Sequence, residues 1–173
     1  MPENKLRKCL KEGIRGGERH KGLKRISFSE EKIKGHIDKA KHNFEAMLSF
    51  HRTGFSDWSA SAAFYCLYHC LLALIAKEGF ESRNQSCTFA LVEDMIQKGR
   101  ISLKKEELKE IYDKDITEEL ENSHKVADIR ENMQYSVKTS LEEQEFQDLK
   151  ERTKKLFNKL RIEVEREEKA GFH

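Results

Sequence analysis

Residues 56–77, SDWSASAAFYCLYHCLLALIAK, form the most apolar stretch of this 173-residue chain. On a helix, the apolar side chains of this stretch would cover most of the circumference and not one face alone. A helix of that kind must be surrounded by neighbours. Gly79 follows at a position where glycine commonly ends a helix. We therefore predict that residues 56–77 are the central helix of a helical domain.

Amphipathic helices are predicted on both sides of this stretch. The preceding one begins near Ser29, which can cap the first amides, keeps apolar residues at steps of three and four, and ends at Gly54. Three more are predicted: residues 86–98, residues 104–135 with a bend near 122–125, and a last helix that starts at Ser140 in a capping box with Glu143. Strand-like alternation is missing. The prediction is an all-α, up-and-down antiparallel bundle of four to five helices.

Residues 1–28 differ from the rest in charge. They carry nine Lys or Arg against three Glu, whereas the whole chain has a formal net charge of only +2. Leu6, Leu10 and Ile14 are spaced for a short amphipathic helix, and the glycines of residues 13–22 predict a flexible connector. We predict a basic, partly flexible N-terminal extension (1–28) before one helical domain (29–170). Such a tail either contacts nucleic acid or is simply solvated.

The length, the apolar runs and the cysteines of the chain indicate which classes of protein it can belong to. The length fits one domain with a real core. No apolar run approaches the ~20 residues that span a bilayer, and the N-terminus lacks the apolar segment of a secretory signal. Cys66 and Cys70 lie among leucines, where free cysteine behaves as a small hydrophobe. We predict a cytoplasmic protein without a membrane segment, metal site or cofactor.

Two motifs on the predicted helices carry a family resemblance. Residues 63–69 read AFYCLYH and are followed by an alanine–leucine pair and Gly79; residues 130–135 read RENMQY. In type, order and spacing they resemble the small stand-alone HEPN proteins of bacteria and archaea. The second motif is similar to that of the branch in which a tyrosine follows the arginine after four intervening residues. The resemblance covers about residues 33–165.

The resemblance implies a helical bundle that is commonly a homodimer and is often produced beside a minimal nucleotidyltransferase as a toxin–antitoxin pair. It also implies a relationship to metal-independent ribonucleases, in which a histidine follows the arginine by four to six residues. In this chain no histidine follows Arg130 until His173, and Tyr135 occupies the motif position. Gln134 and Gln85 stand where relatives often have aspartate and histidine.

Arg130, Tyr135 and His69 are the candidate catalytic residues, and the same three with Tyr65 are the candidate ligand-binding residues. RNA cleavage needs a group that transfers protons near neutral pH and a cation that stabilises phosphorane charge. Arg130 supplies the cation, but tyrosine titrates near ~10 and lies about 140° around the helix from Arg130. His69 is a surrogate base if it shares a cleft with Arg130. The alternatives are a paired structural Arg130, a Tyr135 that anchors the helix end, and a hydrogen-bonded core His69.

Together these observations predict a HEPN-like, dimeric module that binds a nucleotide, RNA or a partner protein with weak or no catalysis. The first alternative is a metal-independent endoribonuclease that uses Arg130. The second is a purely structural dimerisation module. The exposed part of residues 65–68, or the helix that carries Arg130, is the expected interface.

Overall fold

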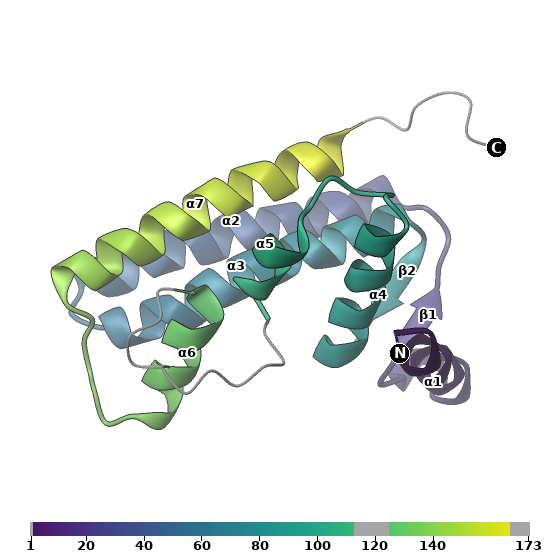
Figure 1. The fold of residues 1–173 in the computed structure, drawn as a ribbon, viewed down its shortest axis with the longest axis horizontal. Helices are drawn as coiled ribbons and strands as arrows, with labels where there is room; N and C mark the ends of the chain where they lie inside the picture. The colour runs from purple at the N-terminus through teal and green to yellow at the C-terminus, as the bar shows by residue number, and fades with distance from the viewer. Residues whose placement is uncertain (1, 113–124, 167–173) are drawn as a thin grey trace.

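The computed structural model describes residues 2–112 and 125–166, which fold into helices and one small sheet (Figure 1). This confirms the predicted all-α class. The elements, in chain order, are α1 (Pro2–Arg15), a 3-10 turn (Gly17–Arg19), β1 (Leu23–Arg25), α2 (Glu30–Arg52), α3 (Ser56–Lys77), β2 (Phe80–Ser82), α4 (Gln85–Gln97), α5 (Lys105–Lys109), α6 (Val126–Tyr135) and α7 (Glu143–Glu165).

Helix α3 is the centre of the fold, as predicted from its apolar circumference. It contacts α2, α7, α6 and α4, and Figure 1 shows α2, α3 and α7 running side by side. Nearly all of α3 from Ala62 to Ala76 is buried. By length and composition alone this helix could cross a membrane, but its burial among the other helices is that of a core helix.

The predicted boundaries of α2 and α3 are confirmed. Ser29 Oγ accepts a hydrogen bond from the Lys32 amide at 3.2 Å and caps α2. Gly54 and Gly79, which follow α2 and α3, have φ angles of +88° and +86°, which glycine adopts without the clash that a Cβ would cause.

The start of α7 differs from the prediction. The helix begins at Glu143, and the amide of Glu142 donates to Glu145 Oε1 at 3.1 Å, so Ser140 and Glu143 do not form the cap. The reason is a tertiary contact: the amide of buried Leu141 donates to Ser56 Oγ at 2.7 Å. This bond ties the chain to the start of α3 and keeps it extended through Glu142.

Residues 104–135 do not form the predicted bent helix in the part that the structure describes. Helix α5 ends at Lys109, and the amide of Ala127 donates to the carbonyl of Glu110 at 2.9 Å, so the two ends of the described segments lie together. Residues 113–124, which include most of the predicted bend, lie outside the described residues.

The N-terminal segment has more regular secondary structure than predicted. Gly13 lies inside α1, and β1 pairs antiparallel with β2 with Leu23 opposite Ser82, although neither the strands nor this pairing was predicted. The flexibility expected of residues 1–28 stays a prediction, but two of the connector glycines have a packing role. A Cβ on Gly13 would lie 1.7 Å from the carbonyl oxygen of Leu23, and one on Gly22 would lie 2.3 Å from that of Cys9. These glycines allow β1 to approach α1 closely.

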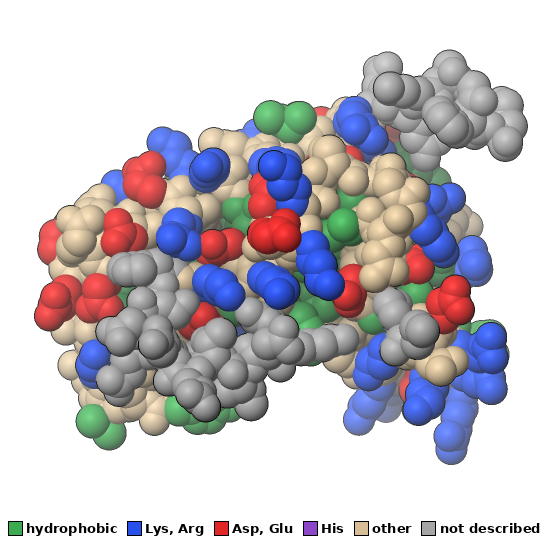
Figure 2. Space-filling view, viewed as in Figure 1, with side chains coloured by type: hydrophobic (Ala, Val, Ile, Leu, Met, Phe, Trp, Pro, Cys, Tyr) green, Lys and Arg blue, Asp and Glu red, His purple; other side chains and the backbone are tan. Residues whose placement is uncertain are grey.

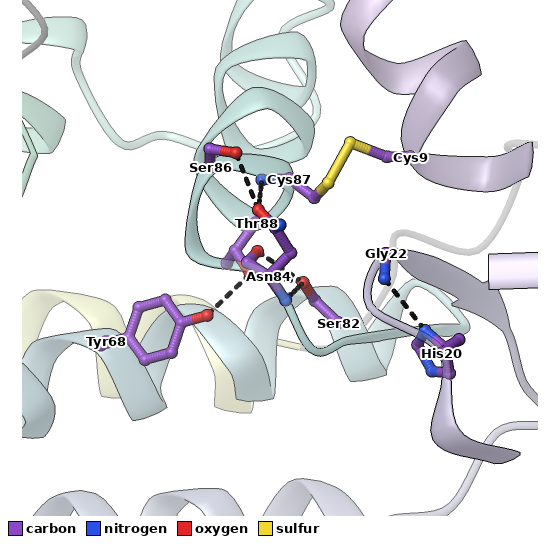
Figure 3. Close-up of a disulfide and its surroundings, with 9 residues drawn as sticks. All are labelled: Cys9, His20, Gly22, Tyr68, Ser82, Asn84, Ser86, Cys87 and Thr88. Atoms are coloured by element: carbon purple, nitrogen blue, oxygen red, sulfur yellow. Dashed lines mark hydrogen bonds between the residues drawn. A yellow bond between two sulfur atoms is a disulfide. The ribbon is translucent and has the colours of Figure 1, made fainter. Parts of the chain in front are cut away.

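A disulfide between Cys9 and Cys87 joins α1 to α4 (Figure 3). The sequence did not predict this pair. Cys66 and Cys70 are free and buried, as expected, and burial raises the pKa of both thiols. Disulfides persist mainly in oxidising compartments, so the cytoplasmic location stays a prediction.

Candidate functional site

The aromatic residues of α3 build one wall of the candidate site. The ring of Phe64 stacks on that of Tyr68, with centroids 5.8 Å apart, and meets Tyr65 edge to face at 5.1 Å. Phe64 is buried, whereas Tyr65 is 38% exposed. The spacing of one helical turn between residues 64 and 68 places both rings on the same side of α3. This wall is therefore fixed in the core at one edge and open to solvent at Tyr65.

The side chain of Tyr68 is buried in the core and does not reach the open side of the site. Its hydroxyl lies 3.0 Å from Thr88 Oγ1, which in turn donates to Ser82 Oγ at 2.7 Å (Figure 3). The Tyr68 pKa is raised by burial. The hydroxyl is thus satisfied by α4 and the loop before it, close to the disulfide.

Arg130 extends from α6 across this aromatic wall. Its guanidinium carbon lies 4.0 Å from the centroid of Phe64 and 5.7 Å from that of Tyr65. Stacking of a guanidinium on aromatic faces contributes about 0.5–2 kcal/mol and fixes its plane. The Nε atom of Arg130 is buried and has no hydrogen-bond partner among the described residues. Arg130 and Tyr65, two of the predicted ligand-binding residues, are therefore brought together.

Tyr135 is not part of this arrangement. It is the last residue of α6 and is 78% exposed. Five residues along a helix turn the side chain by about 140°, so Tyr135 leaves α6 on a different face from Arg130.

His69 pairs with His36 of α2. Their Nδ1 atoms lie 3.1 Å apart, so one ring donates and the other accepts, which requires at least one neutral imidazole. Burial, followed by the charges of His36 and Lys39, lowers the pKa of His69 to about 4. The pKa of His36 is lowered by burial and by Lys32, against the effect of Glu81. A histidine with so low a pKa is a weak base at neutral pH, which argues against the surrogate-base hypothesis.

The histidine pair predicts acid sensitivity of the fold. The unfolded chain binds a proton at His69 near pH ~6.5, whereas folded His69 resists protonation until about pH 4, so the stabilisation is complete above the first value and falls with acid between the two. Because His69 is only half buried, we expect a loss of about 1–2 kcal/mol, measured by urea denaturation from pH 7 to 4.5. In His69→Gln this slope should decrease, and in the exposed control His42→Gln it should persist. An unchanged slope in His69→Gln would contradict the assignment.

A second polar cluster, which the sequence did not reveal, lies at the base of the N-terminal segment. Buried His20 accepts the Gly22 amide on Nδ1, which leaves its Nε2–H to donate to Glu81 at 3.0 Å. Lys32 donates to the other Glu81 oxygen at 2.8 Å. Hydrogen bonds from Lys32 and then His20 lower the Glu81 pKa to about 2. The cluster joins the loop before β1 to β2 and α2, and its sequence separation of up to 61 residues gives no local signal.

Metal-ligating side chains do not gather in groups of three or more anywhere in residues 2–112 and 125–166. Cys66, His69 and Cys70 share one side of α3, but the two thiols are buried with raised pKa values. The thiolate forms that a metal needs are thus disfavoured.

The fold and the site define an all-α bundle in which Arg130 of α6 lies over an aromatic wall carried by the central helix α3. The family model described as HEPN domain matches residues 33–163. The chain therefore belongs to the HEPN domain family, which supports a nucleotide- or RNA-related function in the broad sense. No curated protein matches the chain significantly.

Proposed function

We propose that the protein binds a phosphate group of a nucleotide or RNA at Arg130 and has little or no ribonuclease activity. The observation that carries this proposal is the Arg130 guanidinium, which lies over the ring of Phe64 and has a buried Nε that lacks a partner among the described residues. A guanidinium held in this way presents its remaining N–H groups in a fixed fork, which suits phosphate. Its charge is not neutralised by any described carboxylate within ion-pair distance.

The positions of the two candidate bases, Tyr135 and His69, support binding without efficient catalysis. Tyr135 is exposed at the end of α6, and the Nδ1 of His69 is engaged by His36. The pKa of His69, about 4, keeps this ring neutral and weakly basic near pH 7. Among the described residues, the site thus offers the cation of the ribonuclease chemistry, while neither Tyr135 nor His69 is placed to act as its acid or base.

Self-association or a protein partner is part of the same proposal. Large apolar side chains that are exposed together mark interaction surfaces. The large apolar side chains exposed on and next to α3 and α6 are Phe55, Trp58, Tyr65, Tyr135 and Val137. We propose a homodimer, and a minimal nucleotidyltransferase as the partner of a toxin–antitoxin-like pair. Light scattering and co-purification from the native host test these two steps.

The test of the site compares wild type with Arg130→Ala. We expect wild type to bind ATP or a short RNA in isothermal titration, and Arg130→Ala to bind at least tenfold more weakly because the phosphate loses its cation. In EDTA, neither protein should cleave RNA. Arg161→Ala is a matched control: Arg161 of α7 also lies over an aromatic ring, that of Phe157, at 5.3 Å, and its buried Nε has no partner in residues 2–112 and 125–166.

Each other outcome overturns a stated part of the proposal. Metal-independent cleavage by wild type that is lost in Arg130→Ala would make the protein a ribonuclease and Arg130 catalytic. Equal binding by wild type and Arg130→Ala would remove Arg130 from the ligand site. No binding by wild type, together with a normal dimer, would leave a structural dimerisation module.

A further inference from the structure

Helix α1 presents a strongly basic surface that lies outside the region matched by the HEPN family. Figure 2 shows Lys and Arg side chains gathered at the corner of the molecule that α1 occupies in Figure 1. Four of them, Arg7, Lys8, Lys11 and Arg15, are exposed on α1 and are called here the α1 basic face. Within the described residues none of these four has a carboxylate within ion-pair distance. The positive charge of this face is therefore available to a ligand.

The regular spacing of these cations suits a chain of phosphates. At 100° per residue, Lys8, Lys11 and Arg15 fall within about 60° of one another around α1, with Arg7 at the edge. Along the axis they are separated by about 4.5 and 6 Å. The acidic residues of α1 are exposed as well: Glu3 lies about 140° from Lys8 around the helix, whereas Glu12 lies about 40° from Lys8 and borders the row on one side. The row is a linear array of positive charge.

The opposite side of α1 is fixed to the rest of the protein. Cys9 is bonded to Cys87 of α4, and Gly13 allows the close approach of β1. The carbonyl of Gly22 accepts the amide of Arg83 at 3.0 Å, which extends the pairing of β1 with β2 by one hydrogen bond at the end where Leu23 lies opposite Ser82. A 14-residue helix is marginal alone in water, so these contacts hold it in place. The basic face is consequently preformed, which lowers the entropic cost of binding.

The same packing identifies the kind of ligand. A helix that binds a lipid surface inserts an apolar face beside its basic one. In α1 the apolar residues Leu6 and Leu10 pack against the hydrophobic core instead, and only Ile14 is exposed. A row of unpaired cations without an apolar face matches the phosphate backbone of a nucleic acid, whose binding is electrostatic.

We propose that the α1 basic face binds the phosphate backbone of RNA. This is a second contact surface, separate in sequence from Arg130, and it does not require that Arg130 bind a nucleotide. Its contribution is independent of base sequence, because phosphate contacts carry no sequence information. The surface holds RNA against the protein, and the HEPN bundle is free to make other contacts.

The test is the affinity for a fluorescein-labelled, single-stranded 20-nucleotide RNA, measured by fluorescence anisotropy at several salt concentrations. The variant is Lys8→Gln/Lys11→Gln/Arg15→Gln, and the control is Lys41→Gln/Lys154→Gln/Lys155→Gln, which removes three exposed lysines from α2 and α7. We expect the α1 variant to bind at least tenfold more weakly near 0.1 M salt. The slope of log K against log salt should fall by about 2, since each single-strand phosphate contact contributes about 0.7.

The control variant should retain most of the wild-type affinity and slope. Equal losses in the α1 and control variants would overturn the proposal, because binding would then follow total charge and not this face. Wild-type affinity in the α1 variant would overturn it as well. The proposal would also be overturned if the wild-type protein did not bind RNA but bound vesicles of phosphatidylserine and phosphatidylcholine through the same residues.

Discussion

In Phe64→Ala we expect the free energy of unfolding to fall by about 3–5 kcal/mol, the range for an aromatic side chain deleted from a core. The side chain of Phe64 is 2% exposed and its ring stacks on that of Tyr68, so removing the ring leaves a cavity in the hydrophobic core beside α3. The same change removes the ring under Arg130, whose guanidinium lies 4.0 Å from the Phe64 centroid. Urea denaturation measures the first effect, and nucleotide or RNA binding by the remaining folded protein measures the second.

The exposed aromatic residue Trp58 provides the control on the same helix. Its side chain is 58% exposed, so Trp58→Ala should cost less than about 1 kcal/mol. Phe64→Leu keeps most of the apolar volume but removes the flat face, and should weaken ligand binding with a smaller loss of stability. If Phe64→Leu binds ligand as wild type does, the aromatic wall is not what orients Arg130.

Loss of the Cys9–Cys87 bond is expected to lower stability by about 2–4 kcal/mol, the usual range for a native disulfide. The bond closes a long loop, with the cysteines 78 residues apart in sequence. For a chain of this size the corresponding decrease in melting temperature is about 5–15 °C. The measurement is thermal unfolding of oxidised wild type against Cys9→Ser/Cys87→Ser.

The double variant also controls for effects of the reducing agent on the two remaining cysteines. Cys66 and Cys70 are free, so dithiothreitol should lower the melting temperature of wild type and leave that of the variant unchanged. Four reactive thiols in the unfolded, non-reduced wild-type protein, counted by mass spectrometry after alkylation, would show that the disulfide does not form. An equal melting temperature for the oxidised protein and the variant would show that the bond does not stabilise α1.

The helices could be predicted from the sequence because their signals are local. Residues 56–77 were predicted with the bounds that α3 has in the structure, and Ser29 caps α2 as expected. The buried apolar residues and threonine of α7 recur at the same helical spacing, and they are Phe146, Leu149, Thr153, Leu156, Phe157, Leu160 and Val164. In each case the pattern repeats every three or four residues, within the reach of one helix.

The features that were missed depend on residues far apart in the chain. The three-residue strands β1 and β2 are too short to alternate visibly, and they pair across more than fifty residues. Likewise, the contact of His36 with His69 depends on how α2 packs on α3. The candidate site was predicted in part: Arg130 and Tyr65 do meet, but periodicity within α6 could not show which α3 ring Arg130 would cover.

The pairing of β1 with β2 has a consequence for synthesis of the protein. Leu23 pairs with Ser82, so the strand near the N-terminus has no partner until the ribosome has made and released the chain past residue 82. At 5–20 residues per second, translation from residue 23 to residue 82 takes roughly 3–12 s. During that interval α2 and α3, which are adjacent in sequence, can already pack together, because local contacts form fastest. The cations of α1 therefore reach their final arrangement late, although they are translated first.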